Sequence, residues 1–248
     1  MTADPLAPLL DLPGVGDGVA ETRAAVDALL GHRVLRRRSV DVSMESSLRG
    51  AWASAQLAGA DHSLDDVRSG AAASDPVVQG ALRVQSAIGA LADTWTRAPR
   101  QALARLHALA AADLVADHDE LGRPAAEPAV AQRLDTLAHV LAHTSAPAVV
   151  VAAIVHGELL SLDAFPPSSG VVARAAVRLT LVERGLDPKS LVVVEAGHRE
   201  LRDEYDAALA AYRTGAPDGI ATWVRHCADA LVAGARESTA ICEALLRG

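Results

Sequence analysis

Aromatic residues are scarce in this chain of 248 residues, which contains one Phe, two Tyr and three Trp. Half of the residues are nevertheless hydrophobic, so the core must be built mainly from Ala, Leu and Val. Ala and Leu are strong helix formers, and small side chains let helices approach one another closely. A chain of this length can bury a full-sized core in one domain, or in a core with a helical extension. The composition therefore predicts a mostly helical protein.

Cysteine and basic charge are also limited. The two cysteines, Cys227 and Cys242, fall in one helical segment and would lie about 22 Å apart in a continuous helix, too far for a disulfide. The net charge of −8 argues against a nucleic-acid or anionic-membrane partner. No apolar run is long enough to span a bilayer, and residues 1–13 lack the features of a signal peptide. We therefore expect a cytoplasmic protein with buried, reduced cysteines.

The spacing of apolar residues predicts helices over more than half of the chain. Ser63 and Asp66 have the spacing of a capping box, and Asp75-Pro76 suits an N-cap followed by the first helical position. The β-branched run 191–194 lies outside the helical pattern and favours a short extended segment. The predicted helices cover residues 19–30, 34–57, 63–68, 77–95, 100–115, 129–143, 147–162, 168–184, 195–213 and 218–246.

Residues 163–174 form the most informative stretch, a loop between two apolar helical runs. The loop resembles the signature of the Fic (Fido) family, His-Pro-Phe-x-(Asp/Glu)-Gly-Asn-Gly-Arg-x-x-Arg. Proteins of that family usually transfer AMP from ATP onto a hydroxyl of another protein. The chain keeps Phe165, Gly170 and Arg174 of this pattern. At the other positions it has Asp163 for the general-base His, Ala164 for the Pro, Pro167 for the acidic residue, Ser168 for the first Gly, Ser169 for the Asn and Val171 for the first Arg.

The resemblance extends beyond this loop. His156 lies where the helix before the family signature often carries a His. Downstream, residues 195–198 and the residues Tyr205, Tyr212 and Trp223 resemble the two helices that follow the signature. The resemblance implies an all-α Fido-like helical bundle, with residues 99–248 forming the core and a C-terminal helix. Residues 1–98 are then an N-terminal helical extension within one compact unit.

A second family feature is expected in that extension. Many Fic proteins carry an inhibitory helix with the pattern (Ser/Thr)-x-x-x-Glu-(Gly/Asn). Residues 54–59 match this pattern at Ser54 and Gly59, but Ala58 replaces the Glu. In the family that Glu pairs with the second signature Arg, which is Arg174 here. The sequence therefore predicts a remnant of an inhibitory helix that lacks its acidic residue.

Several groups that AMP transfer requires are absent together. Asp163 is a poor base at neutral pH because the pKa of an Asp side chain is normally about 4. Pro167 cannot bind Mg²⁺ and removes one backbone donor, and Val171 lacks the positive charge of an Arg. A small anion could still bind to the remaining polar groups, which are Ser168, Ser169, Gly170 and Arg174.

Two hypotheses on function follow. The favoured one is a catalytically inactive, Fic-like binding or regulatory scaffold that contacts a protein partner or itself, without a cofactor. The alternative is a nucleotide-dependent transferase that uses ATP and Mg²⁺, with Asp163 as the base. The resemblance alone leaves open whether Arg174 and Arg178 lie on a solvated face or are buried at the old phosphate site.

Other candidate sites are weaker. His139 and His143 are four residues apart on one predicted helix face, a spacing that can bind zinc, but no third ligand is close in sequence. We therefore predict no metal site. The acidic loop 117–128 is a candidate for the flap that holds the target segment in the family.

Overall fold

The computed structural model describes residues 4–247. Helix makes up 75% of the structure, and no β-strand occurs in these residues, which confirms the prediction of an all-α fold. The elements in chain order are η1 (Ala7–Asp11), α1 (Val15–Leu30), α2 (Leu35–Leu57), α3 (Leu64–Ser69), α4 (Pro76–Arg97), α5 (Pro99–Ala110), η2 (His118–Glu120), α6 (Pro128–His143), α7 (Ala148–Ser161), α8 (Ser169–Glu183), α9 (Val194–Glu200), α10 (Arg202–Arg213) and α11 (Pro217–Arg247).

Two predicted helix starts are confirmed by their hydrogen bonds. In α3 the Ser63 hydroxyl accepts from the Asp66 N–H at 3.1 Å, and the Asp66 carboxylate accepts from the Ser63 N–H at 2.9 Å. In α4 the Asp75 carboxylate accepts from the first two free N–H groups of the helix, at 2.8 and 3.2 Å. These contacts satisfy backbone donors that have no partner inside a helix, so each helix begins where the sequence predicts.

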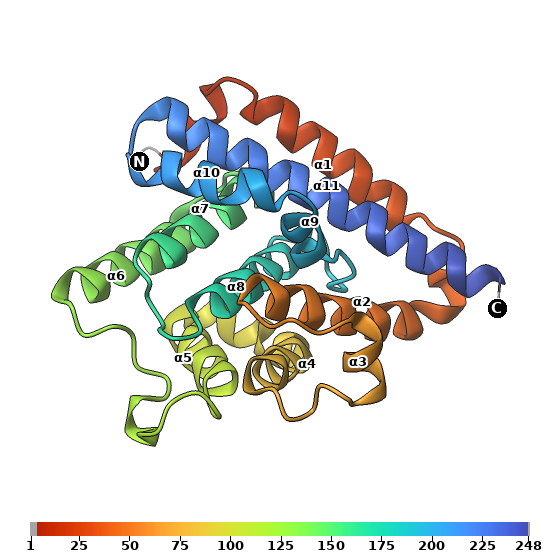
Figure 1. Ribbon diagram of the computed structural model, residues 1–248. Helices are drawn as coiled ribbons and strands as arrows, with labels where there is room; N and C mark the ends of the chain where they lie inside the picture. The colour runs from red at the N-terminus through yellow and green to blue at the C-terminus, as the bar shows by residue number, and fades with distance from the viewer. Residues whose placement is uncertain (1–3, 248) are drawn as a thin grey trace.

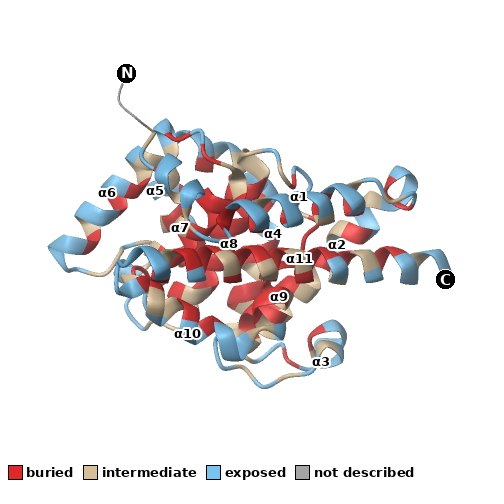
Figure 2. Cartoon of the chain, turned by 90° about the horizontal axis from the view of Figure 1, so that it is seen from above, coloured by how far each residue is buried: buried red, intermediate tan, exposed pale blue. Residues whose placement is uncertain are grey.

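Helix α8 is the centre of the bundle. Every residue from Val171 to Leu181 is buried, and α8 packs against α7, α4, α5 and α2 (Figures 1 and 2). Its small side chains, Ala173, Ala175 and Ala176, allow these neighbours to come close. The residues that resemble the family signature therefore begin the most buried helix of the fold.

The first two helices pack on different parts of the bundle. Helix α1 runs beside the long C-terminal helix α11, whereas α2 crosses the lower half of the molecule and contacts α4, α8 and α9 (Figure 1). The prediction that residues 1–98 are an extension of a core remains a prediction. Among the described residues, no helix is both long enough and apolar enough to cross a membrane.

Helix α1 begins at Val15, not at residue 19, and two further predicted helices differ from the structure. Helix α5 ends at Ala110, not at residue 115, because Arg83 of α4 donates to the carbonyl of Leu109 at 2.9 Å and pairs with Asp113 just beyond the helix end. The helix predicted over 195–213 is two helices with a break at Leu201. The break lets α9 pack against α2 and α11 while α10 packs against α7 and α11.

The β-branched run 191–194 is not a strand. Its backbone is held by a buried side chain, because the Asp187 carboxylate accepts from the N–H groups of Leu191 and Val192 at 3.0 and 2.8 Å. Burial raises the pKa of Asp187, an effect that these backbone donors oppose. The apolar side chains of the run fill the core between α2, α7 and α11.

Candidate functional site

The loop between α7 and α8 exposes Asp163 and the two prolines and buries Ala164 and Phe165. Asp163 is exposed and has a left-handed backbone with φ of 43°. Ala164 and Phe165 are buried, and the exposed residues Pro166 and Pro167 are joined by a cis peptide bond. Phe165 therefore anchors the loop, whereas the position that resembles the general base faces solvent.

The beginning of α8 carries the polar residues that the sequence predicts as a possible anion site. The Ser169 hydroxyl accepts from the Phe165 N–H at 2.8 Å. This hydrogen bond holds the loop against the first turn of α8. The Ser168 hydroxyl is buried and has no hydrogen-bond partner within residues 4–247. The first N–H groups of any helix lack intrahelical acceptors, and those at Gly170 and Val171 follow directly. The predicted anion site therefore consists of one buried hydroxyl without a partner and the N–H groups of a helix start, and it stays a prediction.

Arg174 is buried and bound to the segment predicted to be the inhibitory-helix remnant. Its Nε donates to the Ser54 hydroxyl at 3.0 Å, and its Nη2 donates to the Ser54 carbonyl at 2.9 Å. Ser54 lies in the last turn of α2 and is 2% exposed, whereas Ala58 and Gly59 are exposed at the end of that helix. The structure therefore brings together the two segments that the sequence singled out, but through Ser54 and not through Ala58.

Arg178, one turn further along α8, is also buried, so the interpretation of Arg174 and Arg178 as a solvated face is wrong. Its guanidinium binds both carboxylate oxygens of Glu195, with Nε at 2.8 and 3.1 Å and Nη2 at 2.8 Å. Gln85 donates to the same carboxylate at 2.5 Å. Fully buried and bidentate, this ion pair ties α8 to α9 and α4 and holds the core beside Arg174.

Loop 117–128 lies against the signature loop. The N–H of Ala125 donates to the Ala164 carbonyl at 2.9 Å. His107 of α5 bridges the two loops, because its Nδ1 accepts from the Gly122 N–H at 3.2 Å and its Nε2 lies 3.1 Å from the Pro166 carbonyl. Burial lowers the pKa of His107, so the ring is neutral and can accept at one nitrogen while donating at the other.

The weaker zinc candidate does not form a site. His139 and His143 are exposed and stack with ring centroids 4.1 Å apart. The Nδ1 of His143 lies 2.7 Å from the His139 carbonyl, a contact inside the helix. By contrast, the buried side chains of His156, His198 and Cys227 converge from three helices. Sequence spacing could not reveal that group, because each residue lies on a different helix.

This arrangement of helices is the fold of Fic family proteins. Solved structures confirm it. A Fic family protein from Desulfovibrio desulfuricans G20 aligns with a TM-score of 0.73 and 20% identity, over 92% of this chain and 75% of that one. A segment of Fic-1 from C. elegans aligns with a TM-score of 0.71 and 17% identity, over 96% and 75% of the two chains.

These likenesses concern the fold. No protein-family model matches the chain, and no curated protein sequence matches it. The prediction of a Fido-like helical bundle is therefore confirmed by structure, and the chemistry of the site must be argued from the residues themselves.

Proposed function

We propose that this chain is a non-catalytic Fic-fold protein that acts by binding a protein partner or a second copy of itself. The observation that carries the proposal is that the guanidinium of Arg174 is buried and hydrogen-bonded to Ser54. In the family this Arg serves the phosphates, but here Ser54 accepts two of its hydrogen bonds inside the core. Releasing the guanidinium would leave Ser54 and the Arg unsatisfied in a buried place, which is costly.

The remaining signature positions support the same conclusion. Asp163 is exposed and is a weaker base than His at neutral pH. Pro167 offers no ligand to Mg²⁺. Val171 is 5% exposed and belongs to the hydrophobic core, so an Arg at that position would need a buried acceptor, as Arg174 and Arg178 have. Valine supplies no charge for a phosphate.

A binding role is supported by apolar side chains on the surface. Val40 and Met44 of α2 are 69% and 68% exposed. Met44 borders a groove of about 700 Å³ that Leu82 of α4 and Ile241 of α11 also line. Apolar side chains beside a groove are typical of surfaces that contact other proteins.

One observation favours the alternative, a transferase that uses ATP and Mg²⁺. The buried Ser168 hydroxyl lacks a partner and lies at the start of α8, where the helix dipole favours a phosphate. If a phosphate occupies this place, Ser168 and the N–H groups of Gly170 and Val171 are its donors. In that case Asp163 takes the role of the base.

Calorimetric titration separates the two functions. We expect no measurable heat when ATP with Mg²⁺ is added to the wild-type chain, and none with inorganic phosphate. Micromolar binding of ATP that Ser168→Ala weakens by about tenfold or more would favour the transferase and count against the scaffold. If the chain binds inorganic phosphate but does not bind ATP, the start of α8 is a site for a small anion and not for a nucleotide.

A further inference from the structure

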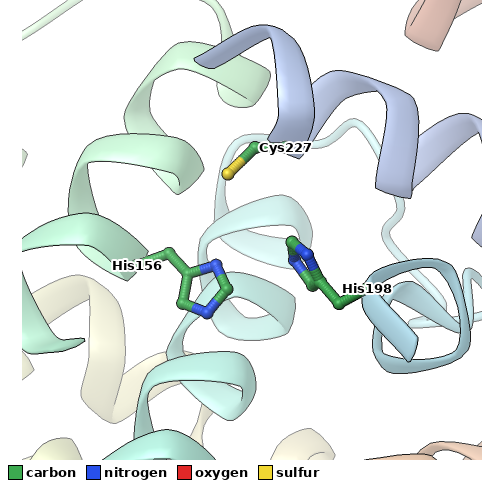
Figure 3. A group of neighbouring side chains, drawn as sticks. All are labelled: His156, His198 and Cys227. Atoms are coloured by element: carbon green, nitrogen blue, oxygen red, sulfur yellow. The ribbon is translucent and has the colours of Figure 1, made fainter. Parts of the chain in front are cut away.

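Three buried side chains from three helices point into one small space beside α8. His156 belongs to α7, His198 to α9 and Cys227 to α11, and they are 0%, 1% and 4% exposed. Figure 3 shows the Cys227 sulfur and the two imidazole rings facing one another. One ring nitrogen of each histidine and the Cys227 Sγ all lie within 4.8 Å of one another. These residue types at this separation are suited to binding a metal ion.

His156 has a nitrogen without a partner. Its Nδ1 is buried and makes no hydrogen bond within the described residues. Its Nε2 lies 2.8 Å from the hydroxyl of Tyr205. A buried polar atom left unsatisfied is costly, and a native structure usually has a reason for one. If Nε2 carries the proton and donates to Tyr205, then Nδ1 presents its lone pair to the space between the three side chains.

His198 is oriented in the same way by a different partner. Its Nδ1 lies 3.1 Å from the Nε2 of His226, which leaves its own Nε2 as the nitrogen able to bind an ion. Metal-binding histidines usually direct their second ring nitrogen at such a hydrogen-bond partner, which fixes the tautomer and the ring orientation. Tyr205 and His226 supply these partners for His156 and His198 respectively.

We propose that His156, His198 and Cys227 form a buried zinc site. Zinc binds imidazole nitrogen at about 2.0–2.1 Å and thiolate sulfur at about 2.3 Å, in tetrahedral geometry. These bond lengths imply ligand atoms roughly 3.3–3.6 Å apart, so atoms that now lie within 4.8 Å of one another must approach by up to about 1.5 Å. On binding, the Cys227 thiol releases its proton to solvent and the sulfur binds as the thiolate.

The space between the three residues has room for one ion. This cavity, which Ala152 and Leu231 also line, has a volume of about 10 Å³, close to the least that holds a single water. The positive charge of Arg174 acts on both histidines and opposes a cation. The thiolate is the ligand that offsets this charge, which is why the site depends on Cys227 more than on either histidine.

A cavity that is open to solvent lies beside the site. His226 lines a cavity of about 750 Å³ whose wall also carries Glu204, Asp218, Asp229 and Arg225. Three carboxylates against one guanidinium attract cations into this cavity. An ion that reaches His226 is then next to His198, the first of the three ligands.

Cobalt(II), which takes the place of zinc and is coloured in a tetrahedral thiolate site, provides the test. Metal-free full-length chain is prepared with a chelator and titrated with Co²⁺. We expect one Co²⁺ per chain, a thiolate-to-cobalt charge-transfer band in the near ultraviolet, and displacement of both by Zn²⁺. Cys227→Ser should abolish the band and weaken zinc binding by about 100-fold, and His198→Asn should weaken it by at least about tenfold.

Cys242→Ser is the matched control, because Cys242 is buried on the same helix but lies outside the group. This variant should keep the full band. Failure of the wild-type chain to bind Co²⁺ with a thiolate band would overturn the proposal, as would a band that survives Cys227→Ser or disappears in Cys242→Ser. Circular dichroism shows that each variant is folded, and the wild-type titration decides the question even if one variant is not.

Discussion

Arg174 of α8 donates to both the hydroxyl and the backbone carbonyl of Ser54, a residue 120 positions earlier in the chain. The contact joins α2 to the central helix and engages the residue that resembles the second Arg of the Fic signature. The segment that holds this arginine resembles the inhibitory helix of the family, with Ala58 where the pattern has Glu.

Ser54→Ala removes the hydroxyl and leaves the Nε of Arg174 without an acceptor in the core. We expect a loss of about 1–3 kcal/mol in the free energy of unfolding, measured by urea denaturation. Ser43→Ala, on the same helix and only partly buried, is the control and should change little. Equal stability of the two variants would mean that the contact with Arg174 contributes nothing to the fold.

Glu195→Gln leaves the buried guanidinium of Arg178 without its counter-charge. Because both side chains are at most 1% exposed, we expect a destabilisation of about 3–5 kcal/mol. Asp27→Asn breaks the pair with Arg23, whose side chains are 64% and 74% exposed, and should cost below about 0.5 kcal/mol. Thermal or urea unfolding measures both, and similar losses in the two variants would contradict the account of α8 as a helix fixed by buried charge.

Acid should loosen loop 117–128. Burial lowers the pKa of His107 below its usual value, so the unfolded chain takes up a proton at a higher pH than the folded protein does. The stability that His107 contributes is complete above its unfolded pKa of about 6.5 and is lost as the pH falls toward the lower folded pKa. Protonation also turns Nδ1 into a donor that faces the Gly122 N–H.

Hydrogen exchange tests this prediction. After correction for intrinsic rates, the Gly122 amide should exchange faster at pH 5 than at pH 7.5. The urea-unfolding free energy should also fall over this range, by less in His107→Gln than in the wild-type chain. His143→Gln is the exposed control and should behave like the wild type. Unchanged protection of Gly122 at pH 5 would show that His107 does not hold the loop.

Gly197→Ala tests the close packing of α9 on α11. A Cβ at this position would lie 1.9 Å from the Ala230 carbonyl oxygen, so α9 would have to move, at a cost of about 1–3 kcal/mol or more. Gly89→Ala, in the middle of α4 with nothing within 4 Å of the new Cβ, should instead stabilise by about 0.5–1 kcal/mol. Unfolding midpoints that shift in the same direction for both variants would contradict this packing.

Much of the fold could be predicted because its signals are local. The capping residues Ser63 and Asp75 begin their helices through contacts only two or three residues away. The signature-like loop could be recognised because its residues are contiguous. A second contiguous pattern, residues 54–59, indicated the segment that contacts Arg174, although the contact is made by Ser54 and not at Ala58. The single helix predicted over 195–213 was wrong at Leu201. The break there is caused by the packing of α9 and α10 against different neighbours, and no residue that disfavours helix marks it in the sequence.

The chemistry of the interior could not be predicted in this way. Glu195 binds Arg178 and Gln85 across three helices, and His156 meets His198 and Cys227 across three others. Spacing within one helix pointed instead to His139 and His143, which the structure places on the surface. Which distant residues meet is decided by how the helices cross, and that depends on the whole set of small side chains around α8.

The central claim is that this Fic-fold chain does not transfer AMP, and a labelling assay tests it most directly. The full-length chain is incubated with Mg²⁺, ATP labelled on the α-phosphate and a mixture of candidate target proteins, beside a Fic protein of known activity as positive control. We predict no label on any protein, including the chain itself, above the level of a reaction without it. Label that depends on this chain, and that Asp163→Asn removes, would contradict the account.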